Sequence, residues 1–265
     1  MKKVLTALLA LALLLSLAAC AALPGETWSD SVPLSSDSLR ELNIDLISGE
    51  LNIYLTDGAS RVDYTIKKGG LVLGDPQLRV RQSGHKTTID TTGYSVNLGG
   101  YFSCDIDVYI PHDVVEELSI EMTSGETSFA DLALRDLNVL LTSGRVDIEN
   151  VTADTLDFEA TSGSADIWGS FDSIDVDVTS GSFDVSTDVL PSRINCEATS
   201  GNIDINIPRD AAGFTLYYER TSGKVSSAFE TSGSSGDHSG SLLYGDGSCM
   251  IEVDITSGSV TIGKN

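Results

Sequence analysis

The sequence predicts an all-β protein: a single-domain β-solenoid, right-handed and parallel β-helix-like, with coils of about 19–20 residues. Three observations predict this fold class. A Ser-Gly pair recurs at a nearly constant interval, the residues before each pair alternate between apolar and polar, and helical periodicity is absent after residue 20. A period near 20 residues is typical of solenoids, in which each coil stacks on the preceding one. Right-handed winding is expected from the crossover preference of parallel strands.

The Ser-Gly pairs are expected to form the corners of the coils. Along the regular stretch from residue 125 to 223 their glycines are 19, 19, 18, 20 and 22 residues apart, and the preceding gap of 76 equals four periods of 19. We predict a structural role in which each glycine supplies a positive φ that a Cβ atom would disfavour. The predicted corner glycines are Gly49, Gly125, Gly144, Gly163, Gly181, Gly201, Gly223 and Gly258.

A strand is predicted on each side of the corner. In the eight copies, 23 of the 24 alternate positions before the Ser-Gly pair are apolar, Arg220 being the exception. After the glycine a second alternating segment follows, as in Val146-Asp147-Ile148. Period-two alternation is the signature of a strand with one buried face. A coil is therefore strand, corner, strand and a connection of variable length.

Two stretches depart from the repeat. Residues 50–110 keep strand character but lack the corner, apart from a hairpin turn expected near Ser83-Gly84. Residues 226–248 are rich in Gly and Ser, and we expect an excursion from the solenoid that holds one extra hairpin at most.

The N-terminal segment has the order of a bacterial lipoprotein signal. Lys2 and Lys3 precede an apolar run from residue 4 to 19, which is too short for a membrane span of about 20 residues. The run ends in Leu17-Ala18-Ala19-Cys20, which resembles a lipobox; the alternative is an ordinary secretory signal cleaved nearby. We predict a signal peptide at 1–19, a lipidated Cys20 with a flexible tether at 20–38, and the solenoid domain at 39–265. The predicted location is the extracytoplasmic face of a bacterial membrane.

The charge of the chain limits its partners. The 16 Lys and Arg residues face 39 Asp and Glu residues, a formal net charge of −23. Nucleic acid is excluded because binding a phosphate backbone needs clustered basic residues. Direct adsorption to an anionic bilayer is disfavoured for the same reason, so contact with the membrane is expected through the lipid on Cys20.

Acidic residues are expected to stack in columns on two outer faces. Like charges at strand spacing repel, and a divalent cation such as Ca²⁺ is one way to relieve the repulsion. One carboxylate per coil makes a poor calcium cage, so we favour hydrated faces, folding without metal, and no cofactor. The predicted columns are Asp147, Asp166, Asp184 and Asp204, which are the candidate metal ligands, and Glu121, Glu159, Asp177, Glu197 and Glu219.

Catalytic residues are not indicated by any motif. Cys104, Cys196 and Cys249 have the parity of inward positions, where cysteine behaves as a small hydrophobe. Cys196 and Cys249 are assigned to coils two apart, a separation of roughly 10 Å that exceeds disulfide reach. A disulfide from Cys104 to one of them stays open.

The repeated Thr-Ser-Gly-x-Val-x-Ile coils resemble a family of bacterial surface domains known as the "putative adhesin" family, whose function is unknown. The stretch Asp107-Val108-Tyr109-Ile110-Pro111 and the segment from Leu242 to Ile262 also carry the resemblance, which covers roughly residues 40–262. It implies a β-solenoid, a lipoprotein or membrane-tethered context, in some cases a link to envelope stress, and no catalytic residues.

Two classes of function follow. The first is a non-enzymatic surface or envelope protein that binds or scaffolds an envelope protein or glycan. The second is a polysaccharide-acting β-helix enzyme. A cleft with a basic residue beside two carboxylates would favour the enzyme.

Overall fold

The computed structural model describes residues 25–265 except 71 and 98–99, and over these residues it is an all-β solenoid, which confirms the predicted fold class. The elements are β1 (Glu26–Pro33), the 3₁₀ helix η1 (Ser36–Ser38), β2 (Glu41–Leu55), β3 (Arg61–Gly69), β4 (Val72–Ser83), β5 (Lys86–Asn97), β6 (Tyr101–Ile110), β7 (Glu117–Ala130), β8 (Asp136–Thr187), β9 (Arg193–Ala198), β10 (Asn202–Ile207), β11 (Gly213–Arg220), β12 (Lys224–Ser227), β13 (Ser232–Ser235), β14 (Ser239–Gly245), β15 (Cys249–Ile255) and β16 (Ser259–Lys264).

Each coil crosses two layers of strands that face each other. Layer A holds the strands before the Ser-Gly corner and layer B holds those after it. From β7 to β10, neighbouring coils pair in parallel one repeat apart: β7 pairs with β8 as Glu117↔Asp136 in layer A and Glu126↔Arg145 in layer B. Farther along, β8 pairs with β9 in layer A and with β10 in layer B, as in Ile174↔Ile194 and Phe183↔Ile203. The predicted coil length is therefore confirmed by the register.

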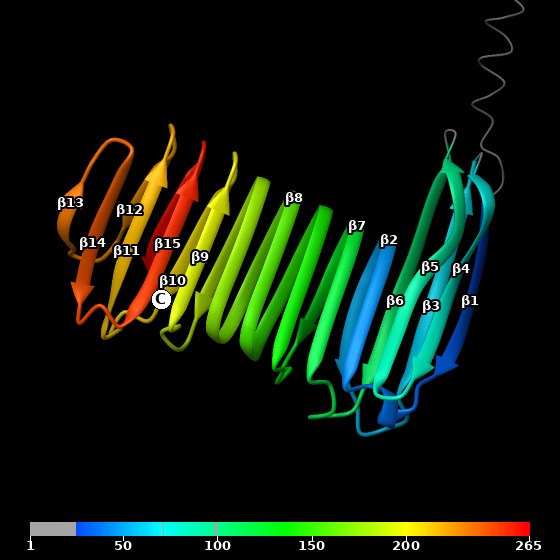
Figure 1. Cartoon of the computed structure of the whole chain (residues 1–265). Coiled ribbons are helices and arrows are strands. Elements are labelled where there is room, and N and C mark those ends of the chain that lie inside the picture. Colours follow the sequence, from blue (N-terminus) through cyan, green and yellow to red (C-terminus); the bar gives the residue numbers. More distant parts are fainter. Residues whose placement is uncertain (1–24, 71, 98–99) are drawn as a thin grey trace, which may run out of the picture.

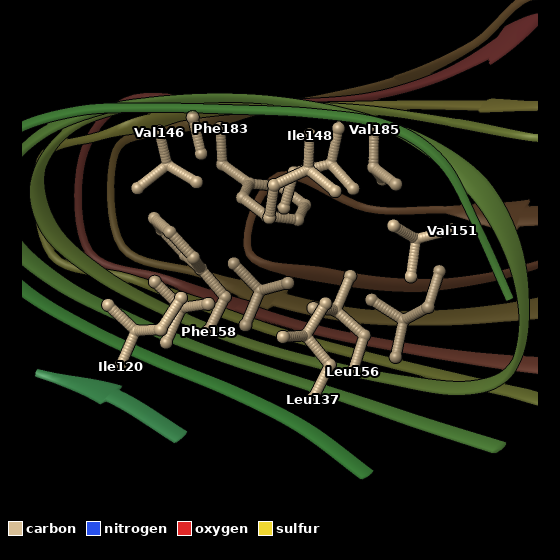
Figure 2. Packing of buried hydrophobic residues seen from close by; sticks show 14 of the residues in the cluster. Ile120, Leu137, Val146, Ile148, Val151, Leu156, Phe158, Phe183 and Val185 are labelled. Atoms are coloured by element: carbon tan, nitrogen blue, oxygen red, sulfur yellow. The ribbon is translucent and has the colours of Figure 1, made fainter. Parts of the chain in front are cut away.

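The core fills the space between the two layers. All 23 apolar residues predicted to point inward are buried. In the centre of the stack, Phe158 of layer A meets Phe183 of layer B with ring centroids 4.8 Å apart (Figure 2). Val151 closes the coil at the edge that lies opposite the Ser-Gly corner. Burying each large apolar side chain contributes about 1.5–3 kcal/mol relative to leaving it exposed, so the repeated alternation drives the fold.

The corner glycines form a column in which each packs on the backbone of the next coil. A Cβ atom built on Gly144 would lie 2.1 Å from the carbonyl oxygen of Gly125, and one on Gly125 would lie 2.0 Å from that of Gly49. The column runs Gly49, Gly125, Gly144, Gly163, Gly181, Gly201, Gly258, Gly223. φ is positive at Gly49, Gly125, Gly144, Gly181 and Gly258, with values from 114° to 146°.

The expectation of a positive φ is wrong for Gly163, Gly201 and Gly223. At these corners the glycine is needed for space alone. A Cβ atom on Gly163 would lie 2.7 Å from Cδ2 of Leu141 and 2.9 Å from the Gly144 oxygen. Close stacking of coils therefore explains all eight glycines, whereas backbone conformation explains five.

The coils do not stack in chain order, contrary to the simple solenoid expectation. β2 lies directly against β7, and the intervening strand β6 pairs with the other side of β2 in layer B (Figure 1). At the opposite end, β15 lies between β9 and β11 in layer A, and β16 lies between β10 and β12 in layer B. The reason is physical: every coil presents the same apolar and glycine pattern, so that pattern does not select which coil becomes the neighbour.

Antiparallel strands complete both ends of the stack. The predicted turn at Ser83-Gly84 joins β4 to β5, with φ of 60° at Gly84. At the other end β13 and β14 form the one hairpin expected within residues 226–248, and β14 pairs with β11. Terminal elements of this kind cap a repeat array.

The tether prediction is wrong for the described residues from Glu26 to Ser38. Residues 26–33 form β1, which pairs antiparallel with β3 from Glu26↔Lys68 to Pro33↔Arg61, and Leu39 beyond η1 is fully buried. The alternating segment Thr27–Val32 supplies a strand in spite of its polar composition, because β3 offers it a free edge. The solenoid domain therefore begins no later than Glu26, well before the predicted boundary at residue 39.

Arg220 does not enter the core despite its inward parity. Its guanidinium donates to the backbone carbonyl oxygens of Gly223, Gly236 and Asp237, at 3.4, 3.2 and 2.9 Å. The side chain therefore joins the last coil of the stack to the turn of the β13–β14 hairpin.

Candidate functional site

The outward faces of the solenoid hold the candidate functional residues of the described chain. Cys20, the predicted lipidation site, lies outside the described residues. In the described part of the chain, the helical structure contains no segment with the length and apolar character needed to cross a membrane.

The predicted column of aspartates lies on the outer face of layer B. Asp184 pairs in register with Asp204, and Asp147 pairs with Ser128 of the preceding coil. Partial burial, and after it the charges of Asp166 and Asp204, raise the pKa of the Asp184 carboxyl above its ordinary value. Among the described residues, no group of three or more His, Cys, Asp or Glu side chains is arranged to hold a metal ion. The carboxylates thus repel one another along the column without converging on one point.

The second predicted column runs along the outer face of layer A with two differences. Leu140 stands between Glu121 and Glu159, where it is 41% exposed. Asp254 stands between Glu197 and Glu219, because β15 is inserted between β9 and β11. The sequence could not reveal Asp254 as a member, since its place depends on the stacking order.

The three described cysteines are free and buried. Cys196 lies opposite Val253 of β15, so the coils of Cys196 and Cys249 are adjacent, and the assignment of these coils as two apart is wrong. The two sulfurs still do not meet, because Cys249 lies at the start of β15, two inward positions before Val253. Burial raises the pKa of the Cys104 and Cys249 thiols to about 12, so all three behave as core residues.

An aromatic stack stands on the outer face of layer B where β6, β2 and β3 meet. The rings of Tyr54 and Tyr109 lie 5.3 Å apart at an interplanar angle of 28°, and the Arg61 guanidinium lies 3.8 Å from the centre of the Tyr109 ring. Tyr109 is thus held between Arg61 and Tyr54, while Tyr54 is 44% exposed. Partial burial, Asp107 and Tyr109 raise the pKa of Tyr54, so its hydroxyl stays protonated at neutral pH.

A hollow of about 500 Å³ opens beside Tyr54, over Ser128 and Ala130 of β7 and toward Asp147 and Glu149 of β8. It exists because β7 places small side chains outward between the larger ones of its neighbours. A hydrogen-bonded chain crosses its rim: Ser128 Oγ donates to Asn52 Oδ1 at 2.8 Å, and Asn52 Nδ2 donates to Asp107 Oδ1 at 3.0 Å. Periodicity in the sequence does not reveal this site, although the outward Tyr54 and Tyr109 interrupt the polar face.

Over the part of the chain that the structure describes, three open hollows contain a basic residue beside carboxylates, the arrangement that would favour an enzyme. In the smallest, on layer B, Arg145 lies 3.9 Å from Asp147. In layer B, Lys67 pairs with Asp105 at 2.6 Å. In layer A, Arg193 pairs with Glu252 at 2.8 Å beside Glu197. Partial burial raises the pKa of the Asp105 carboxyl. Hydrogen bonds from Lys67 and Ser103 outweigh this effect and hold that pKa below its ordinary value. An ionised, paired carboxylate is a poor general acid at neutral pH.

Together, the fold and its outer faces define a class of protein: a capped β-solenoid with open, shallow and acidic surfaces. The model of the Toastrack DUF4097 family matches residues 72–171 and 169–263, and the chain belongs to this family. Comparison with curated proteins gives no match.

Solved structures of low sequence identity also match over most of the chain. A "putative adhesin" from Parabacteroides merdae is 12% identical over 90% of this chain and 97% of its own, with a TM-score of 0.49. A "putative adhesin" from Bacteroides fragilis is 9% identical over 89% and 97%, with a TM-score of 0.38. A "putative cell adhesion protein" from Clostridium sporogenes is 12% identical over 91% and 100%, with a TM-score of 0.35.

Proposed function

We propose that the protein is a lipid-anchored surface or envelope protein of bacteria that binds or scaffolds a partner without catalysing a reaction. The observation that carries the proposal is the order of basic residues, apolar run and Leu17-Ala18-Ala19-Cys20. The solenoid supports it with long outer faces of alternating polar side chains, which are accessible along the stack. An extended repeat surface of this kind suits binding more than it suits enclosing a substrate.

The start of β1 makes the proposed anchor short. Glu26 follows Cys20 by six residues, which reach at most about 20 Å when fully extended. A lipid on Cys20 would therefore hold the end of the stack formed by β1 and β3 close to the bilayer. The net charge of −23 opposes further adsorption to anionic lipids, so the rest of the solenoid would project away.

Metabolic labelling with an alkyne fatty acid tests the anchor. The wild-type protein should take up label and sediment with membranes, whereas Cys20→Ala should do neither. Equal labelling of both forms, or of neither, would refute lipidation at Cys20.

A second candidate function, action on a polysaccharide, is favoured by the open hollows that hold a basic residue beside carboxylates, and the hollow in which Arg193 lies beside Glu197 and Glu252 serves for its test. The test is the release of reducing ends from purified envelope polysaccharide by the wild type and by Glu252→Gln. Release that the substitution abolishes would establish an enzyme, and no release from either form would support the binding role.

A further inference from the structure

The outer face of layer B around Tyr54 is hollowed over several strands. Beside the 500 Å³ hollow lie two others, of about 750 and 130 Å³, and the three share lining residues: Tyr54 joins the first two, Ser128 joins the first and third, and Asn52 joins the second and third. We call these three adjoining hollows the Tyr54 trough. It crosses β1, β3, β6, β2, β7 and β8 in their spatial order, which spans roughly 24 Å at a strand spacing of about 4.8 Å.

We propose that the Tyr54 trough binds an uncharged oligosaccharide, with one sugar ring stacked on the exposed face of Tyr54. This inference rests on the proposed surface-binding role and names the chemistry of the ligand.

The aromatic platform is built before any ligand arrives. Tyr54 loses little freedom on binding because its ring already packs against Tyr109, which Arg61 holds from the other side at 3.8 Å. The outer part of the Tyr54 ring borders the hollow over Ala130, and a flat apolar face beside polar groups matches a pyranose, which has an apolar face and a rim of hydroxyl groups.

The polar groups of the trough suit hydroxyl groups. Asp107, Asp147 and Glu149 offer carboxylate oxygens that accept hydrogen bonds, and the amide of Asn52 is fixed between Ser128 and Asp107. Hydrogen bonds to charged acceptors are stronger than neutral ones, so a few such contacts orient a sugar in a shallow site.

The charges in the trough select against other ligands. Its two lining cations are already paired, Lys67 with Asp105 at 2.6 Å and Arg145 with Asp147 at 3.9 Å, and Arg61 behind Tyr109 is paired with Asp63 at 2.8 Å. The remaining carboxylates repel phosphate and anionic glycans. The same carboxylates accept hydrogen bonds from hydroxyl groups, and because they also attract cations, a basic peptide is the competing ligand that the test includes.

The test uses the full-length protein in a sugar-free detergent and four probes: cellotetraose, maltotetraose, mannotetraose and tetra-N-acetylchitotetraose. Isothermal titration should detect binding of at least one probe. Tyr54→Ala should weaken that binding by about tenfold or more, which corresponds to about 1.4 kcal/mol. Tyr54→Phe keeps the ring and should bind within a few-fold of the wild type. Ala130→Leu should abolish binding by filling the hollow, with an unchanged melting temperature.

Tyr217→Ala is the matched control. Tyr217 is an outward tyrosine of similar exposure, 48% against 44%, but it lines the layer A hollow of Arg193 and Glu252. Tyr217→Ala should leave binding unchanged if the trough is the sugar site, whereas loss of binding would assign the sugar to the layer A hollow. Absence of binding to all four probes would overturn the proposal. So would loss of binding in Tyr217→Ala but not in Tyr54→Ala, or binding of a tetralysine peptide in the trough in place of every sugar. Because the assay needs no anchor, failed lipidation of Cys20 and failed sugar binding are separate results.

Discussion

A turn can require glycine because φ is positive or because a Cβ atom would not fit. Three glycine substitutions separate these two reasons. Gly84 has φ of 60° and open space around its Cα, so Gly84→Ala tests conformation alone. Gly163 has no positive φ but a crowded Cα, so Gly163→Ala tests space alone. Gly144 combines φ of 138° with a Cβ position 2.1 Å from the Gly125 oxygen, so Gly144→Ala tests both.

The expected loss of stability differs among the three variants. In every Gly→Ala variant the stiffer unfolded chain offsets about 0.4–1 kcal/mol of the loss. A left-handed alanine costs about 1–2 kcal/mol, which leaves roughly 0–1.6 kcal/mol for Gly84→Ala. Overpacking costs about 1–3 kcal/mol, which leaves roughly 0–2.6 kcal/mol for Gly163→Ala. For Gly144→Ala, backbone strain of about 1–3 kcal/mol adds to the overpacking, and the same offset leaves roughly 1–5.6 kcal/mol. The obstructing atom is backbone and cannot rotate away.

Urea denaturation followed by circular dichroism measures these free energies of unfolding, and an unchanged m-value shows that the same structure unfolds in each variant. For a domain of this size, the loss in Gly144→Ala corresponds to a melting temperature lowered by about 2 °C or more. Equal losses in the Gly84 and Gly144 variants would show that the carbonyl contact contributes nothing. A neutral Gly144→Ala would refute the stacked-glycine argument as a whole.

Three further predictions concern charge, thiols and the hairpin cap. Because partial burial and the neighbouring carboxylates raise the folded-state pKa of Asp184, its ionisation opposes folding, and this penalty is fully present at neutral pH. Stability should rise as pH falls through the folded-state pKa toward the lower unfolded-state pKa, and Asp184→Asn should melt higher at pH 7 and show a weaker rise. Melting curves at fixed salt measure this, and a lower melting temperature of Asp184→Asn at pH 7 would contradict the raised pKa. Cys104 and Cys249, with thiol pKa values of about 12, should resist alkylation at pH 8 until the protein is denatured. Mass spectrometry measures the labelling, and rapid labelling of the native protein would refute their burial. Arg220→Ala should speed the hydrogen exchange of backbone amides in β13 and β14 and lower the melting temperature by only a few degrees. Unchanged exchange would show that the three carbonyl contacts do not hold the hairpin.

The sequence predicts the coil well because one physical requirement, burial of alternate side chains, acts in each copy. Phe158 and Phe183 are recognisable as facing core residues from their parity alone. The corners are recognisable because only glycine leaves room for the next coil. In contrast, β1 is missed because an edge strand buries little, and its polar residues resemble a linker.

The functional surface is harder to predict because it depends on which coils are neighbours. Asp254 joins the acidic column of layer A only because β15 is inserted between β9 and β11. Tyr54 and Tyr109 belong to strands that are distant in the chain, and they stack because β6 returns to the free side of β2. Periodicity identifies outward positions, but pairing between distant segments decides which of them meet.

The inserted coil also sets an order of events for folding. Residues 213–227 form β11 and β12, and their parallel partners are β15 and β16, which follow them in the chain. A chain that folds from its N-terminal side can pair its strands in succession from β7 to β10. The position next to β9 and β10 must then stay open for one coil. If residues 213–227 docked early on β9 and β10, they would occupy that vacancy as a kinetic trap, because their apolar pattern is equivalent. Assembly avoids this trap when residues 213–227 pair only after β15 and β16 have docked on β9 and β10. The β13–β14 hairpin, which lies between the two coils in the chain, gives the length of chain that this order needs.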